Sequence, residues 1–155
     1  MASAMGFFDR FLASSPEKAA VADLAELAGR KEALIARLER HAGMCSYANL
    51  RAGLELLATN QAESFKTLRS ILSDRDTWPR PPESEPHEGS NNWERLSSDL
   101  ELLRTIAIGM QKAAGTWEGV DAGVAEKLLP IAVADGDAES ELRALALKCD
   151  PQALD

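Results

Sequence analysis

Apolar residues recur every three or four positions through four long stretches of this chain, as one face of an α-helix requires. The pattern predicts four long amphipathic helices, over residues 16–42, 46–74, 92–114 and 121–148. Ser15 before Pro16 is a typical helix start, and Asp121 is placed to cap the fourth helix. Ala, Leu, Glu and Arg are abundant and β-branched residues are few. The expected fold class is therefore all-α, a four-helix bundle.

Further signals bear on where the helices begin, end or bend. Asn91 and Glu94 have the spacing of a capping box, which predicts the start of the third helix. Gly43 is a natural stop for the first helix, and the glycines of 115–119 predict a break after the third. Pro130 removes an amide donor, so it predicts a kink or a restart within the fourth helix.

A proline-rich linker, residues 76–90, separates the second and third predicted helices and contains four of the seven prolines. About sixteen residues at ~3.3 Å each can span ~50 Å, whereas a helix of ~28 residues is only ~42 Å long. The linker is long enough to cross the whole bundle, which would bring Cys45 and Cys149 to the same end. We expect an N-terminal segment, 1–15, followed by one bundle domain, 16–150.

Polar residues interrupt the apolar faces near the middle of three predicted helices. Lys31 lies on the apolar face of the first helix, Gln61 and Ser64 on that of the second, and Asp135 on that of the fourth. A buried Lys or Asp is costly alone but tolerable when paired and hydrogen-bonded. One hypothesis is therefore an internal polar cluster of these four residues. The alternative places them at the edge of the apolar face, with Lys31 reaching water.

Residues 56–69 and 131–143 carry a resemblance to the ferritin-like superfamily, including its rubrerythrin-type bundles. Both segments look like the helix that bears Glu-x-x-His, followed four residues after the His by Leu-Arg. The resemblance implies a four-helix bundle with a long crossover between helices two and three, and a di-iron centre in its core. The family's ligand positions are taken here by Gln61, Ser64, Asp135 and Ala138.

These replacements change the expected function, because Gln, Ser and Ala do not supply the carboxylates and imidazoles that iron or manganese requires. Glu32 and Glu101 are the candidates for the family's further acids; we expect both to face solvent, although a shift of one residue would turn them inward. The leading interpretation is a non-catalytic bundle that acts by protein–protein interaction, without a cofactor. The alternative is a di-metal oxidoreductase or iron-handling protein whose altered site uses Glu32, Glu101 and Asp135.

Charge and cysteine content narrow the expected partners and location. The net charge of −8 repels phosphate backbones, so nucleic acid is not an expected partner. Two distant cysteines suit a reduced, cytoplasmic setting, and no signal-peptide pattern or apolar run of ~20 residues is present. A homodimer or another protein partner is expected.

Residues 5–12 form a short apolar segment with Phe7, Phe8, Phe11 and Leu12 on one side of a possible helix. It is a candidate for docking on the bundle, on a second subunit or on a membrane surface, and its single basic residue favours protein over membrane. His41 and His87 have no companion at metal-ligand spacing, so we expect structural or solvent positions for them.

Overall fold

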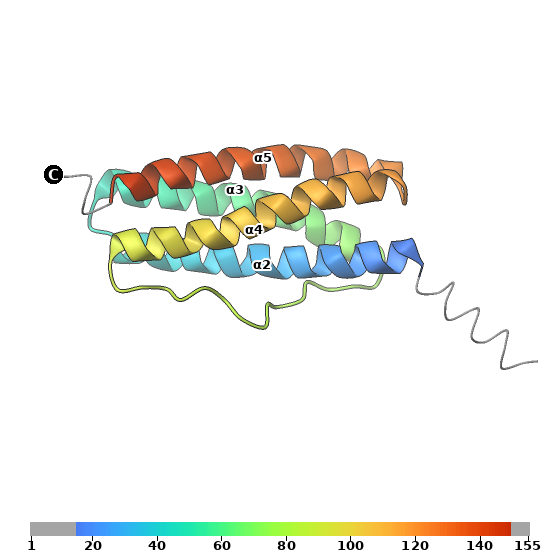
Figure 1. Cartoon of the computed structure of the whole chain (residues 1–155), viewed down its shortest axis with the longest axis horizontal. Helices are drawn as coiled ribbons and strands as arrows, with labels where there is room; N and C mark the ends of the chain where they lie inside the picture. The colour runs from blue at the N-terminus through green and yellow to red at the C-terminus, as the bar shows by residue number, and fades with distance from the viewer. Residues whose placement is uncertain (1–14, 150–155) are drawn as a thin grey trace, which may run out of the picture.

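The computed structural model describes residues 15–149, which form four α-helices and no strand. The helices are α2 (Pro16–Met44), α3 (Ala48–Ser73), α4 (Asn92–Glu118) and α5 (Ala122–Leu147), and they lie side by side as a bundle (Figure 1). The all-α prediction is confirmed for these residues. None of these four helices is long and apolar enough to cross a membrane. The predicted N-terminal segment lies outside the described residues.

Side-chain caps fix the starts of α4 and α5. Asn91 accepts a hydrogen bond from the backbone N–H of Glu94 at 2.9 Å, as the predicted capping box requires. Glu94 reaches back to the backbone N–H of Ser90, at 2.7 Å, rather than to that of Asn91. Asp121 accepts from the N–H groups of Gly123 and Val124, as predicted for the cap of the fourth helix.

Two predicted interruptions differ from the structure: the break at Gly115 and a restart at Pro130. Helix α2 ends at Met44, one residue after the predicted stop at Gly43, whereas α4 passes through Gly115 to Glu118. Trp117, in the last turn of α4, is fully buried, and its burial outweighs the ~1 kcal/mol that one glycine costs a helix. Helix α5 is also one element without a restart, because Pro130 is exposed and water can solvate the carbonyl that it leaves unpaired.

The segment between α3 and α4 lies along α2. The Arg80 N–H donates to the carbonyl oxygen of Ala25 at 2.9 Å, and Arg37 donates to the carbonyl oxygen of Pro86, also at 2.9 Å. Ala25 and Arg37 are about 18 Å apart along the helix axis. The segment therefore runs along α2 in the same direction as the helix. Helices α3 and α4 both start at the end of the bundle where α2 and α5 finish (Figure 1).

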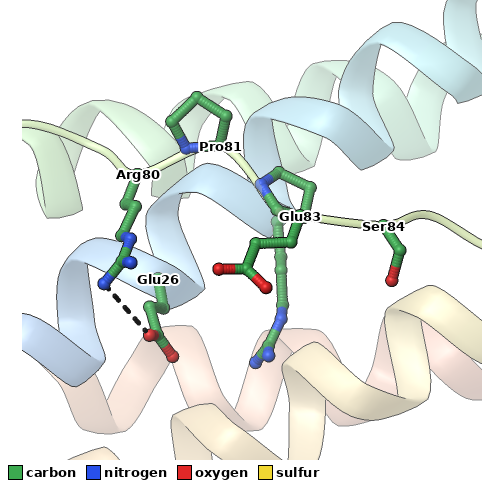
Figure 2. Close-up of a pocket in the computed structure, with 7 residues that line it drawn as sticks. Glu26, Arg80, Pro81, Glu83 and Ser84 are labelled. Carbon is green, nitrogen blue, oxygen red and sulfur yellow. Dashed lines mark ion pairs between the residues drawn. The ribbon is translucent and has the colours of Figure 1, made fainter.

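Gly29 allows the linker to lie directly on α2. A Cβ atom at this position would fall 1.6 Å from the carbonyl oxygen of Arg80, so a larger residue forces the linker away. Figure 2 shows this stretch, where the Arg80 guanidinium is 3.6 Å from the Glu26 carboxylate beside a pocket of about 300 Å³. Pro81 and Glu83 line the linker side of this pocket.

Candidate functional site

Three of the predicted polar residues meet in the interior of the bundle, each from a different helix. The Nζ atom of Lys31, on α2, lies 2.6 Å from Oδ1 of Asp135, on α5, and 2.7 Å from Oε1 of Gln61, on α3. The Gln61 amide nitrogen donates to the same Asp135 oxygen at 3.0 Å, which closes a triangle of hydrogen bonds. The three side chains are at most 2% exposed. We call Lys31, Gln61 and Asp135 the central polar cluster.

The helical period explains why these side chains converge. Lys31 follows the buried Leu27 by four residues, and Asp135 follows the buried Ile131 by four, so each continues an inward-facing row. Gln61 occupies the same relative place four residues after Leu57. The cluster therefore sits among leucines, where a charge is stable only with a partner.

Burial and ion pairing shift the pKa of Lys31 in opposite directions. Burial lowers the pKa of the Lys31 ammonium, because removal from water disfavours the charged form, while the charge of Asp135 and its hydrogen bond oppose this shift. Oδ1 of Asp135 accepts two hydrogen bonds, but the buried Oδ2 has no hydrogen-bond partner within residues 15–149. A carboxylate with one unpaired oxygen depends strongly on its remaining contacts.

Ser64 does not join the cluster, contrary to the hypothesis that its hydroxyl supports the ion pair. It is half-buried, and its Oγ donates to the backbone carbonyl of Gln61, one turn earlier in α3, at 3.0 Å. Ser hydroxyls often bond to their own helix in this way. Glu32 and Glu101 are both exposed, as expected, and therefore do not face the centre.

The donor set at the centre is poor for a divalent metal ion. It offers one carboxylate and one amide, and an ammonium already occupies the space between them. Ala138, which the resemblance to the ferritin-like superfamily places where the second imidazole would be, is buried and offers no donor atom. Within residues 15–149, no three His, Cys, Asp or Glu side chains are grouped as a metal site requires.

A second buried polar cluster lies nearer to the end of α2 and was not predicted. The Arg37 guanidinium donates from Nε to Oδ1 of Asp99 at 2.9 Å, and Nδ1 of His41 lies 2.5 Å from the other carboxylate oxygen. Arg37 also donates to the hydroxyl of Ser98. All four side chains are buried. We call Arg37, His41, Ser98 and Asp99 the second polar cluster.

This second cluster holds the linker against α2. Arg37 binds the Pro86 carbonyl and lies 3.6 Å from the Glu85 carboxylate. Nε2 of His41 lies 3.5 Å from the Glu88 carboxylate, which also pairs with the exposed Arg40. The linker is thus attached to α2 through the same residues that pair with Asp99 of α4.

The sequence contained a signal for this cluster. Asp99 lies three residues after Leu96 and four before Leu103, so it interrupts an apolar row just as Lys31 and Asp135 do. If the inward-facing row of this helix is assumed to pass through Leu100, Asp99 falls one residue outside it. Leu100 is in fact only half-buried.

A third feature is a hollow of about 760 Å³ at one end of the bundle, lined by Tyr47, Leu50, Trp93 and Cys149 among others. Burial, and to a smaller extent the nearby Cys45, raise the pKa of the Cys149 thiol. Cys45 directly follows α2 and Cys149 lies just after α5, and these two helices finish at the same end of the bundle (Figure 1).

The resemblance to the ferritin-like superfamily rests on the chain's own residues. No protein-family model matches this chain, and no curated protein is significantly similar to it.

Proposed function

We propose that this chain is a ferritin-like four-helix bundle in which an internal ion pair takes the place of the metal centre, and that it acts by binding other proteins. The path of the linker supports the ferritin-like part of this proposal. Residues 76–90 pass along α2 between two helices that start at the same end, which is what a crossover connection does.

The Lys31–Asp135 contact is the observation that carries the proposal. In the di-metal bundles, carboxylates from all four helices and two imidazoles converge on the ions. Here an ammonium, itself a cation, binds the single central carboxylate at 2.6 Å. Such a pair neutralises the charge of Asp135 without a metal ion, so the scaffold is left with its surfaces as the means of action.

Several surface features support protein binding, with a homodimer as the simplest assembly. Tyr47 is 69% exposed and Trp78 is 66% exposed, and large aromatic side chains are enriched in protein interfaces. Tyr47 also lines the hollow at the end of the bundle, beside Trp93. A net charge of −8 adds attraction for partners with a basic surface.

The test is the metal content and the mass of the purified full chain. Protein produced in medium supplemented with iron and manganese is analysed by mass spectrometry of the elements, with a di-iron bundle protein purified in parallel as the control. The proposal expects much less than one metal ion per chain, whereas about two per chain would contradict it. Sedimentation velocity then measures the assembly, and a monomer at all concentrations would remove the homodimer from the proposal.

A further inference from the structure

The hollow at the end of the bundle is formed by the ends of three helices. Helices α3 and α4 start at this end, and α5 finishes there (Figure 1). Residues 47–50 line the hollow from the start of α3, residues 91–93 from the start of α4, and residues 145, 148 and 149 from the end of α5. We call it the end hollow. No residue of the central polar cluster or of the second polar cluster lines it, so it is a separate feature.

The end hollow has the size and the apolar side chains of a small-molecule site. Its volume is about 760 Å³, within the ~300–1,000 Å³ that is typical of ligand pockets. Trp93 and Leu145 line it and also pack against the hydrophobic core, and Tyr47 is 69% exposed. A ligand with an apolar body would remove these side chains from water, which is favourable.

The charge of the lining favours one kind of apolar ligand. Within residues 15–149, Lys148 is the only charged side chain that lines the end hollow, although the whole chain has a net charge of −8. The lining therefore offers a cation and no carboxylate. An anionic group on the ligand would pair with Lys148, whereas a cationic group would have no partner there.

Three asparagines add hydrogen-bonding groups to the lining. Asn49, Asn91 and Asn92 all line the end hollow. The side-chain oxygen of Asn91 accepts from the N–H of Glu94 in the cap of α4, so its NH₂ group carries the donors that are left for a ligand. Amide NH₂ groups donate to carboxylate or sulfonate oxygens, and these bonds are strengthened by the charge of the acceptor.

We propose that the end hollow binds a small organic anion with an apolar body, such as an aromatic or alkyl carboxylate. The apolar body lies against Trp93 and Leu145, and the anionic group pairs with Lys148 and accepts from the asparagine amides. This ligand uses both parts of the lining, whereas an uncharged apolar molecule would make no use of Lys148.

Binding of a fluorescent organic anion to the full chain is the first test. 8-Anilinonaphthalene-1-sulfonate combines aromatic rings with one sulfonate, and its emission rises when the rings leave water. The proposal expects saturable binding of one molecule per folded chain, and displacement of the probe by decanoate. No saturable binding, or no displacement by decanoate, would overturn the proposal.

A variant of Lys148 tests the role of charge. Lys148→Met should weaken binding of the sulfonate probe about two- to fivefold, as the loss of an exposed ion pair does. It should leave binding of N-phenyl-1-naphthylamine, which has the same rings without the sulfonate, unchanged. Lys127→Met, at an exposed position of α5 outside the lining, is the matched control and should alter neither probe. Equal effects of Lys148→Met on the two probes would overturn the proposal.

Two variants of α3 test the location. Ala48 lines the end hollow, and Ala52, one turn further along, does not. Ala48→Glu puts a carboxylate into the lining and should weaken binding of the sulfonate probe by more than about fivefold, because like charges repel. Ala52→Glu should bind it as the wild type does. Both positions are exposed, so both variants should fold, which circular dichroism checks. Equal binding by the two variants would overturn the proposal.

Cys149 gives an independent readout of the location. It lines the end hollow and is half-buried, whereas Cys45 is buried. Saturating decanoate should slow the reaction of Cys149 with N-ethylmaleimide, measured by mass spectrometry of tryptic peptide 149–155. An unchanged rate under conditions in which decanoate displaces the sulfonate probe would show that the anion binds elsewhere, and would overturn the proposal.

Discussion

Lys31 and Asp135 are 104 residues apart in sequence, yet their side chains form a 2.6 Å ion pair inside the bundle. Both are almost completely buried, and each depends on the other because an unpaired charge is costly in an apolar interior. Gln61 completes the arrangement by accepting from Lys31 and donating to Asp135. The contribution of this ion pair to the free energy of unfolding can be measured with variants of Lys31 and Asp135.

Asp135→Ala should destabilise the protein, because it leaves the Lys31 ammonium buried without a carboxylate. We expect the free energy of unfolding to fall by about 3–5 kcal/mol. The double variant Lys31→Met/Asp135→Leu should be close to the wild type or more stable, because it removes both charges together. Urea denaturation measures the three proteins. A harmless Asp135→Ala substitution would show that the pair does not form.

Stability should depend on pH through Lys31. Burial lowers its pKa below the ordinary 10.5, so between the lowered value and 10.5 the unfolded chain holds a proton that the folded chain has released. Stability rises with pH wherever the unfolded state binds more protons, so Lys31 should make the free energy of unfolding increase across this interval.

Denaturation curves recorded from neutral pH up to 10.5 test this expectation. The wild type should show a rise that Lys31→Met/Asp135→Leu lacks. Lys18→Met, at an exposed position of the same helix, is the matched control and should retain the rise. The same pH slope in all three proteins would contradict the assignment to Lys31.

Asp99→Asn should loosen the linker as well as the helices. It removes the charge that pairs with the buried Arg37, so we expect a loss of about 3–5 kcal/mol in the free energy of unfolding. Arg37 and His41 also contact the linker, so hydrogen exchange at residues 84–89 should become faster. Glu101→Gln, exposed on the same helix, is the control and should alter neither quantity. If hydrogen exchange at residues 84–89 were unchanged in Asp99→Asn, the second polar cluster would not be what holds the linker against α2.

Gly29→Ala and Gly115→Ala should have opposite effects on stability. A methyl group at Gly29 collides with the backbone of Arg80, and overpacking of this kind costs about 1–3 kcal/mol. Gly115 is exposed within α4 and has nothing near its Cβ position, so alanine there should stabilise the protein by about 0.5–1 kcal/mol. Thermal denaturation measures whether Gly29→Ala is less stable, and Gly115→Ala more stable, than the wild type. If both variants were stabilised, the linker could not lie against α2 as the structure shows.

Helical periodicity was sufficient to predict the four helices and three of the four polar positions. Lys31, Gln61 and Asp135 lie on rows whose spacing directs them inward, and a row of leucines leaves little room for another placement. Ser64 was misplaced because it lies at the edge of its row, where its own helix backbone offers an acceptor.

The remaining errors arise where packing between distant segments decides the outcome. The break expected at Gly115 did not account for the burial of Trp117, and a restart at Pro130 did not account for the exposure of this proline. Asp99 was not predicted as a buried polar residue, because the inward-facing row of α4 can be assigned one residue too late, through Leu100. The contacts of the linker with Arg37 and Gly29 join residues about fifty positions apart, which local patterns do not encode.

The most direct test of the central claim is a crystal structure of the protein grown in the presence of iron and manganese, with anomalous data at the edges of both metals. The account predicts no anomalous peak between Lys31, Gln61 and Asp135, and an Nζ–Oδ1 contact at hydrogen-bond distance. A well-occupied cation held by Asp135 together with acids from other helices would contradict it.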